Sequence, residues 1–218
     1  MAKHPELLSE VPFGAVLTYS PRGTSTVSRK SQNITVAIKR DQRTPFGYVA
    51  RAAERTAESI SKTEGLSDFL GPEVTLIPAP RSAPLVTGAL WPSWRICEEL
   101  IAHGLGKEIL PCLLRKQAVK KAAFAAPGER PNAREHLESM AVESQLLSPA
   151  KLTIVDDVVT KGSTLLAAAT LVADAFPDSE VRVFAVVRTM GLIPDVEKII
   201  DPAVGKIVRV GYDADRQP

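Results

Sequence analysis

The sequence has few residues of the kinds that form disulfides or hold zinc. Its 218 residues include two cysteines, Cys97 and Cys112, and three scattered histidines. The two cysteines stand outside any paired spacing, so we expect reduced thiols rather than a disulfide framework. The histidines form no zinc motif with them. These scarcities exclude a disulfide-rich module and a zinc finger from the classes of protein to consider.

The chain also lacks a large net charge and a long apolar run. Its net charge of +2 does not predict a protein that coats nucleic acid, although local patches stay open. No apolar run is long enough to span a bilayer, and MAKHPELLSE at the start lacks the apolar segment of a secretory signal. With 44% apolar and 24% charged residues, we expect a cytoplasmic globular protein with one sizeable core and no membrane partner.

Strand-like and helix-like segments alternate along the chain. Strands are expected at 74–80, 152–157, 181–187 and 206–212, and helices at 48–64, at 94–103 after a cap at Ser93, and at 163–176. This order predicts an α/β fold with a mostly parallel sheet flanked by helices. Residues 15–20 and 34–39 look like two strands, which predicts an N-terminal β-hairpin within a small peripheral hood. We expect a single domain over 1–218, with the hood at about 15–40 and the core at about 70–190.

The most informative stretch is LTIVDDVVTKGST, from Leu152 to Thr164. An apolar strand ends on two acids, and a helix begins a few residues later. In an open parallel sheet, ligands bind beyond the carboxyl ends of the strands. Free backbone N–H groups at the start of a helix suit a phosphate, and ionised carboxylates suit the hydroxyls of a sugar. The stretch therefore predicts a site for a phosphorylated pentose such as ribose 5-phosphate.

Other phosphate motifs fit the chain less well. It contains no G-x-x-x-x-G-K-[ST], and Gly104 and Gly106 lack the third glycine of a dinucleotide-binding fingerprint. The plain alternative is a solvated strand end followed by a helix cap. Two adjacent acids repel each other and seldom help stability, so the plain alternative is the weaker one.

The stretch IVDDVVTKGSTL resembles the phosphoribosyl pyrophosphate (PRPP) signature of the type I phosphoribosyltransferases. The resemblance implies that Asp156 and Asp157 hold the ribose hydroxyls and act as catalytic residues. It also implies that the 5-phosphate is bound by Thr160, Lys161, Gly162, Ser163 and Thr164. Lys161 alternatively points to solvent while its backbone N–H binds.

A second loop, LIPAPRSAP at 76–84, resembles the pyrophosphate loop of the same superfamily and in particular of ComF-like proteins. This implies that Arg81, as a further catalytic residue, approaches the pyrophosphate with Ser82 beside it. The alternative is a proline-rich turn with a surface arginine. The resemblance further implies a Mg²⁺ ion held mainly by the substrate's own oxygens rather than by protein ligands.

The segment 113–135 is basic and contains Pro127, Gly128 and Pro131, so we interpret it as a long loop. In the family, a catalytic lid stands at this place, and the resemblance implies that its cations are Arg115, Lys120, Lys121 and Arg130. A solvated charged loop and a local nucleic-acid contact stay open. Asn132 and Glu135 also form a candidate capping box, so residues 132–142 can begin a helix instead of returning to a strand.

The function that the resemblance implies is transfer of the 5-phosphoribosyl group from PRPP to an acceptor, with release of pyrophosphate. Two alternatives stay open. One is a PRPP-sensing protein without turnover, and the other is a ComF-like protein that acts in DNA uptake or defence. The acceptor is not legible in the sequence, and association into a homo-oligomer stays open.

Overall fold

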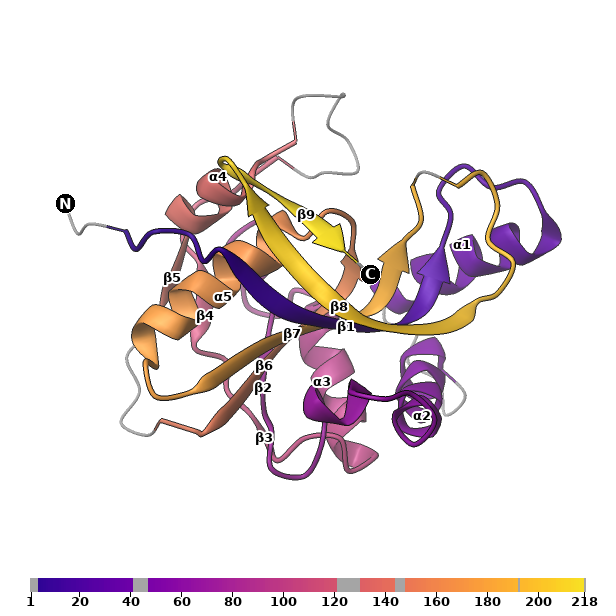
Figure 1. Cartoon of the computed structure of the whole chain (residues 1–218), viewed down its shortest axis with the longest axis horizontal. Coiled ribbons are helices and arrows are strands. Elements are labelled where there is room, and N and C mark those ends of the chain that lie inside the picture. Colours follow the sequence, from indigo (N-terminus) through magenta and orange to yellow (C-terminus); the bar gives the residue numbers. More distant parts are fainter. Residues whose placement is uncertain (1–3, 41–46, 121–129, 144–147, 192, 218) are drawn as a thin grey trace.

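The computed structural model describes residues 4–40, 47–120, 130–143, 148–191 and 193–217. A seven-stranded sheet in the order β3-β2-β6-β7-β1-β8-β9 runs through the molecule (Figure 1). Its strands are β1 (Glu10–Tyr19), β2 (Thr75–Pro78), β3 (Glu108–Ile109), β6 (Lys151–Val159), β7 (Glu180–Thr189), β8 (Ile200–Val210) and β9 (Asp213–Gln217). The first five in sheet order are parallel, whereas β8 is antiparallel to β1 and β9 to β8. A separate antiparallel pair joins β4 (Leu113–Arg115) to β5 (Met140–Val142).

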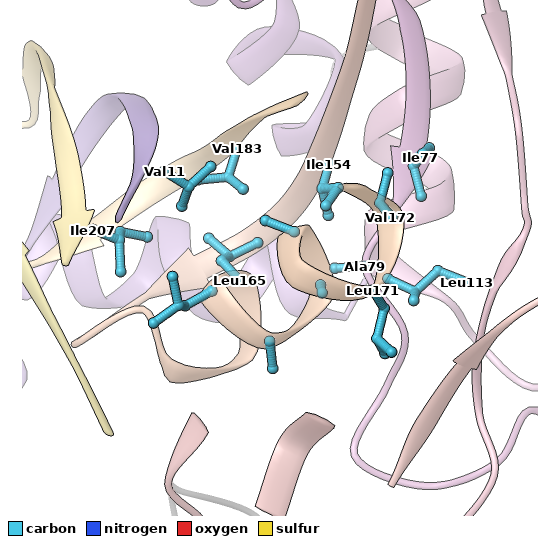
Figure 2. Packing of buried hydrophobic residues seen from close by; sticks show 14 of the residues in the cluster. Val11, Ile77, Ala79, Leu113, Ile154, Leu165, Leu171, Val172, Val183 and Ile207 are labelled. Atoms are coloured by element: carbon cyan, nitrogen blue, oxygen red, sulfur yellow. The ribbon is translucent and has the colours of Figure 1, made fainter. Parts of the chain in front are cut away.

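Helices cover both faces of the sheet. They are α1 (Thr26–Lys39), α2 (Tyr48–Ile60), α3 (Pro92–Ala102), α4 (Ala133–Glu138) and α5 (Ser163–Ala175), with a 3₁₀ turn at Leu66–Asp68. One buried cluster joins the sheet to α4 and α5, and Figure 2 shows part of it around Leu165 and Val172. The other cluster joins the opposite face to α1, α2 and α3. The expected α/β fold with a mostly parallel, helix-flanked sheet is confirmed.

Alternation of side chains along the central strands explains why two cores form. Ile154 packs into the cluster beneath α5, whereas the next residue, Val155, packs into the cluster beneath α3. Val183 and Phe184 of β7 divide in the same way. Successive residues of a strand face opposite sides of the sheet, so a continuous apolar run is required where both faces are covered.

None of the helices in the described part of the chain is both long enough and apolar enough to cross a membrane.

The predicted N-terminal hairpin is wrong. Its first strand exists as part of β1, but residues 34–39 belong to helix α1. The side chain of Ser25 caps this helix by accepting a hydrogen bond from the backbone N–H of Ser28. The β-branched run ITVAIK is typical of a strand, yet the buried residues of α1 recur at helical spacing, and the Thr35 hydroxyl donates to the Ser31 carbonyl. Tertiary packing therefore outweighs β-propensity here.

Residues 113–135 are not one long loop, because β4 occupies 113–115 and α4 begins at Ala133. The capping box of Asn132 and Glu135 is present and starts a six-residue helix, after which β5 follows. Both alternatives for 132–142 thus hold in succession. The cap of α3 is Trp91 rather than Ser93.

Candidate functional site

The two adjacent acids lie where β6 continues past its shorter neighbour. Strand β2 ends with Pro78 opposite Val155, while β6 extends through Asp156 and Asp157 to Val159. The prediction that the two acids end their strand is therefore wrong, because β6 continues to Val159. The acids do stand beyond the carboxyl end of β2. This is the edge of a parallel sheet at which ligands bind.

The two carboxylates have different surroundings. Asp156 accepts hydrogen bonds from the backbone N–H of Asp157 at 2.8 Å and from the Ser93 hydroxyl at 3.3 Å. Asp157 accepts from the backbone N–H of Val158 at 2.7 Å and faces the Lys39 ammonium at 3.8 Å. Burial, together with the neighbouring charge of Asp157, raises the pKa of Asp156 to about 7. The pair can bind hydroxyls or a cation, but it does not carry two fully solvated charges.

The turn from β6 into α5 forms a loop that is rich in backbone N–H groups. Gly162 adopts φ +97°, a left-handed conformation that favours glycine. A Cβ atom at this position would also lie 2.6 Å from the side chain of Ile207. Within the described part of the chain, the N–H groups from Gly162 to Thr164 have no acceptor. The loop therefore presents free donors at the positive end of a 13-residue helix.

An acid from the C-terminal hairpin already contacts this loop. Asp213, the first residue of β9, accepts a hydrogen bond from the Ser163 hydroxyl at 2.6 Å and lies 3.3 Å from the Lys161 ammonium. Burial acts to raise the pKa of Asp213, but the bonds from Ser163 and the Ala214 N–H, together with Lys161, outweigh it and lower that pKa. The Arg216 guanidinium also donates to the Thr160 carbonyl at 3.2 Å. The β8–β9 hairpin thus packs directly on the loop.

Two cavities of similar size adjoin at the acids. The first, of about 350 Å³, is lined by Arg130, Pro131, Asn132, His136, Asp156, Val158, Val159, all of 160–164, Leu165 and Asp213. The second, of about 360 Å³, is lined by Lys39, Ala79, Pro80, Arg81, Ser82, Pro92, Ser93, Arg115, Val119, Lys120, His136, both acids and Thr164. Asp156, His136 and Thr164 belong to both. The first cavity is rich in backbone donors, and the second contains four cationic side chains.

The Pro-Ala-Pro loop that carries Arg81 and Ser82 is held in place by bonds from other segments. The Ala79 N–H donates to the Val155 carbonyl at 2.8 Å, and the indole N–H of Trp91 donates to the Ala79 carbonyl at 2.8 Å. Both bonds fix the backbone just before Arg81, and the loop lines the second cavity. Trp91 thus acts through packing and this bond.

Arg115 fixes the same loop from the other side and is not a mobile cation. Its side chain is 5% exposed, and its guanidinium donates to the Arg81 carbonyl at 2.9 Å and to the Ser139 hydroxyl. Burial lowers the pKa of Arg115 to about 10, opposed by the charge of Asp156. Lys120 lines the second cavity and Arg130 the first. Lys121 lies outside the described residues.

Three residues enter the site without a clear sequence signal. Lys39 arrives on α1, which sequence reasoning places in a strand, and Asp213 arrives on the C-terminal hairpin. His136 lies 3.2 Å from the Thr164 hydroxyl through Nε2. Burial, followed by the charge of Arg115, lowers the pKa of His136 to about 4, so the ring is neutral at physiological pH. The capping box that starts α4 predicts that His136 lies in a helix, but it does not place that helix near the site.

Among the residues described, no group of three or more His, Cys, Asp or Glu side chains is placed to hold a metal ion.

No protein-family model matches the chain, and no curated protein matches it. Solved structures give weak matches. A hypoxanthine phosphoribosyltransferase from Staphylococcus aureus is 10% identical over 70% of this chain and 81% of its own, with a TM-score of 0.36. A hypoxanthine phosphoribosyltransferase from Trypanosoma cruzi is 13% identical over 91% and 78% of the two chains, with a TM-score of 0.32. Scores and identities this low assign no activity to the chain.

Proposed function

We propose that the protein is a Mg²⁺-dependent phosphoribosyltransferase that binds PRPP across the two adjoining cavities and transfers the 5-phosphoribosyl group to an acceptor. The observation that carries the proposal is the arrangement of three chemistries in a row. A loop of free backbone donors stands at one end, paired carboxylates in the middle, and cationic side chains at the other end. PRPP presents a phosphate, two adjacent ribose hydroxyls and a pyrophosphate in the same order.

Each group of PRPP meets side chains of suitable chemistry. The 5-phosphate accepts hydrogen bonds from the loop 160–164, whose hydroxyls and N–H groups line the first cavity. The ribose hydroxyls donate to Asp156 and Asp157, which are hydrogen-bond acceptors when ionised. Arg81, with Lys39 and Lys120, faces the pyrophosphate in the second cavity. Arg115 lines the same cavity but acts chiefly by positioning the backbone of Arg81.

The reaction these groups favour is displacement at C1 of the ribose. A lone pair on the acceptor forms the new bond to C1 while the bond from C1 to the pyrophosphate oxygen breaks. Pyrophosphate leaves with the bonding electrons, and the acceptor loses its proton to solvent. Cations fixed around the departing pyrophosphate stabilise its growing negative charge. Lys120 and Arg130 place further positive charge beside the cavities. Such charge suits a lid that excludes water from the reaction.

The acids also fit a Mg²⁺ ion that PRPP brings with it. Burial, followed by the charge of Asp157, raises the pKa of Asp156, so a cation at the pair would favour its ionised form. Mg²⁺ is commonly held by one or two carboxylates together with substrate phosphates and water. When bound, the ion would neutralise pyrophosphate charge, and Asp156 and Asp157 are the residues that would contact it or its water. Lys39 supplies part of that positive charge in the chain itself.

The order of the Pro-Ala-Pro loop, the basic segment and the acid-bearing strand supports placing this enzyme with ComF-like phosphoribosyltransferases. The acceptor stays open, because the sequence carries no signature for a particular base.

Calorimetric titration with PRPP and Mg²⁺, followed by a pyrophosphate assay over a panel of bases and nucleotides, tests the proposal. We expect binding, and release with at least one acceptor. Asp157→Ala is expected to weaken PRPP binding about 10- to 100-fold because it removes a charged acceptor of ribose hydroxyls. The matched control is Asp178→Ala, an exposed acid just before β7 at the opposite end of the sheet.

The possible outcomes separate the candidate functions. Binding of PRPP without pyrophosphate release, with any acceptor tried, identifies a sensing protein rather than an enzyme. Absence of PRPP binding by the wild-type chain overturns the proposal. Salt-dependent binding to oligonucleotides that weakens when Lys120 and Lys121 are neutralised would indicate a nucleic-acid function instead.

A further inference from the structure

A carboxylate of the chain itself lies against the proposed phosphate loop. The carboxylate of Asp213 accepts a hydrogen bond from the Ser163 hydroxyl and pairs with Lys161, and Asp213 lines the first cavity. Figure 1 shows β9, which begins at Asp213, alongside the loop region that leads into α5. An internal carboxylate thus uses side-chain donors that a bound phosphate would need.

We propose that Asp213 occupies part of the phosphate position in the unliganded chain and competes with the ligand's phosphate for this loop. The inference rests on the proposed function, since it takes the loop 160–164 as the 5-phosphate site. It makes Asp213 the residue that sets how strongly the loop binds anions. Asp213 lies outside the sequence signature at 152–164.

Asp213 and a bound phosphate would compete because they need the same hydrogen-bond donor and carry charge of the same sign. The Ser163 hydroxyl has one hydrogen to donate, and Asp213 takes it at 2.6 Å. A phosphate in the loop would stand next to a carboxylate of the same sign. For unit charges about 5 Å apart, the repulsion corresponds to roughly 4-fold in affinity in water-like surroundings and more than about 100-fold at an effective dielectric constant near 20. Because the side chain of Asp213 is 33% exposed, the lower part of that range applies.

The carboxylate can leave the loop without unfolding the hairpin. The turn before it consists of Gly211, in the left-handed conformation at φ +61°, and Tyr212, which is 72% exposed. The hairpin itself is held by its pairing with β1, and the Arg134 N–H donates to the Tyr212 carbonyl at 3.1 Å. A rotation of the Asp213 side chain toward solvent therefore frees Ser163 and Lys161, while the backbone of β8 and β9 stays paired.

The test compares anion binding by the wild type and by Asp213→Asn. Asparagine keeps an oxygen that accepts from Ser163 but removes the charge. Inorganic phosphate and ribose 5-phosphate are titrated, and the amide signals of Gly162, Ser163 and Thr164 are followed by nuclear magnetic resonance. We expect Asp213→Asn to bind both probes about 5- to 20-fold more tightly than the wild type. The matched control is Asp215→Asn, which removes an exposed acid from the same strand and is expected to change affinity less than about 2-fold.

A second measurement needs no variant. In the wild type, saturation with PRPP or ribose 5-phosphate should move the carboxyl carbon signal of Asp213 and leave that of Asp215 in place. Unchanged or weaker binding by Asp213→Asn would overturn the inference, since Asp213 would then position Ser163 rather than compete. Tighter phosphate binding by this variant, combined with no PRPP binding by either chain, would support the inference and overturn the proposed function. If neither chain binds phosphate or ribose 5-phosphate while the wild type binds PRPP, the inference fails and the proposed function stands.

Discussion

Asp156 and Asp157 are neighbours in β6, yet their carboxylates have different electrostatic surroundings. Asp157 faces the Lys39 ammonium at 3.8 Å, whereas Asp156 is desolvated and receives its side-chain hydrogen bond from the neutral Ser93 hydroxyl. A raised pKa on one of two adjacent acids is common at sites that bind cations or polar ligands. A cation bound at the proposed site would therefore reduce the cost of holding Asp156 charged, which would link stability to binding at this residue.

The first prediction at this scale concerns Asp156→Asn and pH. The pKa of Asp156 rises on folding from its ordinary value of 3.8 to about 7, so the folded chain binds a proton that the unfolded chain releases. This contribution to stability is present at low pH and is lost as pH rises from about 4 to 7. Above pH 7 we expect Asp156→Asn to be more stable than the wild type by about 1–3 kcal/mol, and to bind PRPP poorly. Urea unfolding at several pH values measures this.

His136 makes the stability depend on pH in the opposite direction to Asp156. Its pKa falls to about 4 on folding, so stability from the neutral ring is lost as pH drops from about 6.5 to 4. In the wild type the two groups oppose each other over this range. Asp156→Asn should therefore lose stability more steeply on acidification than the wild type does. A stability difference between the two chains that stays constant from pH 4 to 8 would contradict the prediction for Asp156.

At the scale of elements, the junction of β6 and α5 depends on one glycine. Gly162 has φ +97°, and its missing Cβ leaves room for Ile207 of β8. We expect Gly162→Ala to lower the free energy of unfolding by about 2–4 kcal/mol, because left-handed strain and a clash with a buried side chain add together. Chemical denaturation measures the change. Gly191→Ala, where a new Cβ meets nothing within 4 Å, is the control, and equal effects at both positions would be evidence against this account.

The same junction shows why part of the candidate site can be predicted from the sequence. Acids, glycine and hydroxyls from Asp156 to Thr164 are contiguous, so strand and helix patterns alone bring them to one edge of the sheet. The segment 34–39 shows the opposite case. Its β-branched residues favour a strand locally, but the cap at Ser25 and the burial of small residues such as Ser31 make it a helix. Local patterns succeed where the residues of the candidate site are contiguous in the chain and fail where packing of distant segments decides the structure.

At the scale of the whole molecule, the site joins segments that are far apart in the chain. Lys39 comes from α1, Arg81 from the loop after β2, and Asp213 from the final hairpin. Only the sheet order, with β1 and β8 beyond β7, places these segments around β6. Sequence reasoning could name Arg81 because its loop has a pattern of its own. It could not name Lys39 or Asp213, because nothing near either residue indicates which strand it will face.

Because the site has two cavities, we expect that binding of the pyrophosphate and binding of the 5-phosphate can be weakened separately. Lys39 lines the cationic cavity and not the donor-rich one. We expect Lys39→Met to weaken binding of PRPP and of pyrophosphate about 5- to 20-fold, since one charge near the pyrophosphate is lost. Ribose 5-phosphate, which lacks the pyrophosphate, should bind within about 2-fold of the wild type. Calorimetry with the three ligands in the presence of Mg²⁺ measures the contrast.

The control for this contrast is Lys30→Met, an exposed lysine on the same helix, which removes the same charge without reaching the cavity. It separates a local effect from a change in net charge, because long-range attraction of anions would fall equally in both variants. Lys39 also faces Asp157 at 3.8 Å. If Lys39→Met weakens binding of ribose 5-phosphate as much as binding of PRPP, the lysine acts through Asp157, a proposed ribose ligand. The pyrophosphate must then be bound by Arg81 and Lys120 without it.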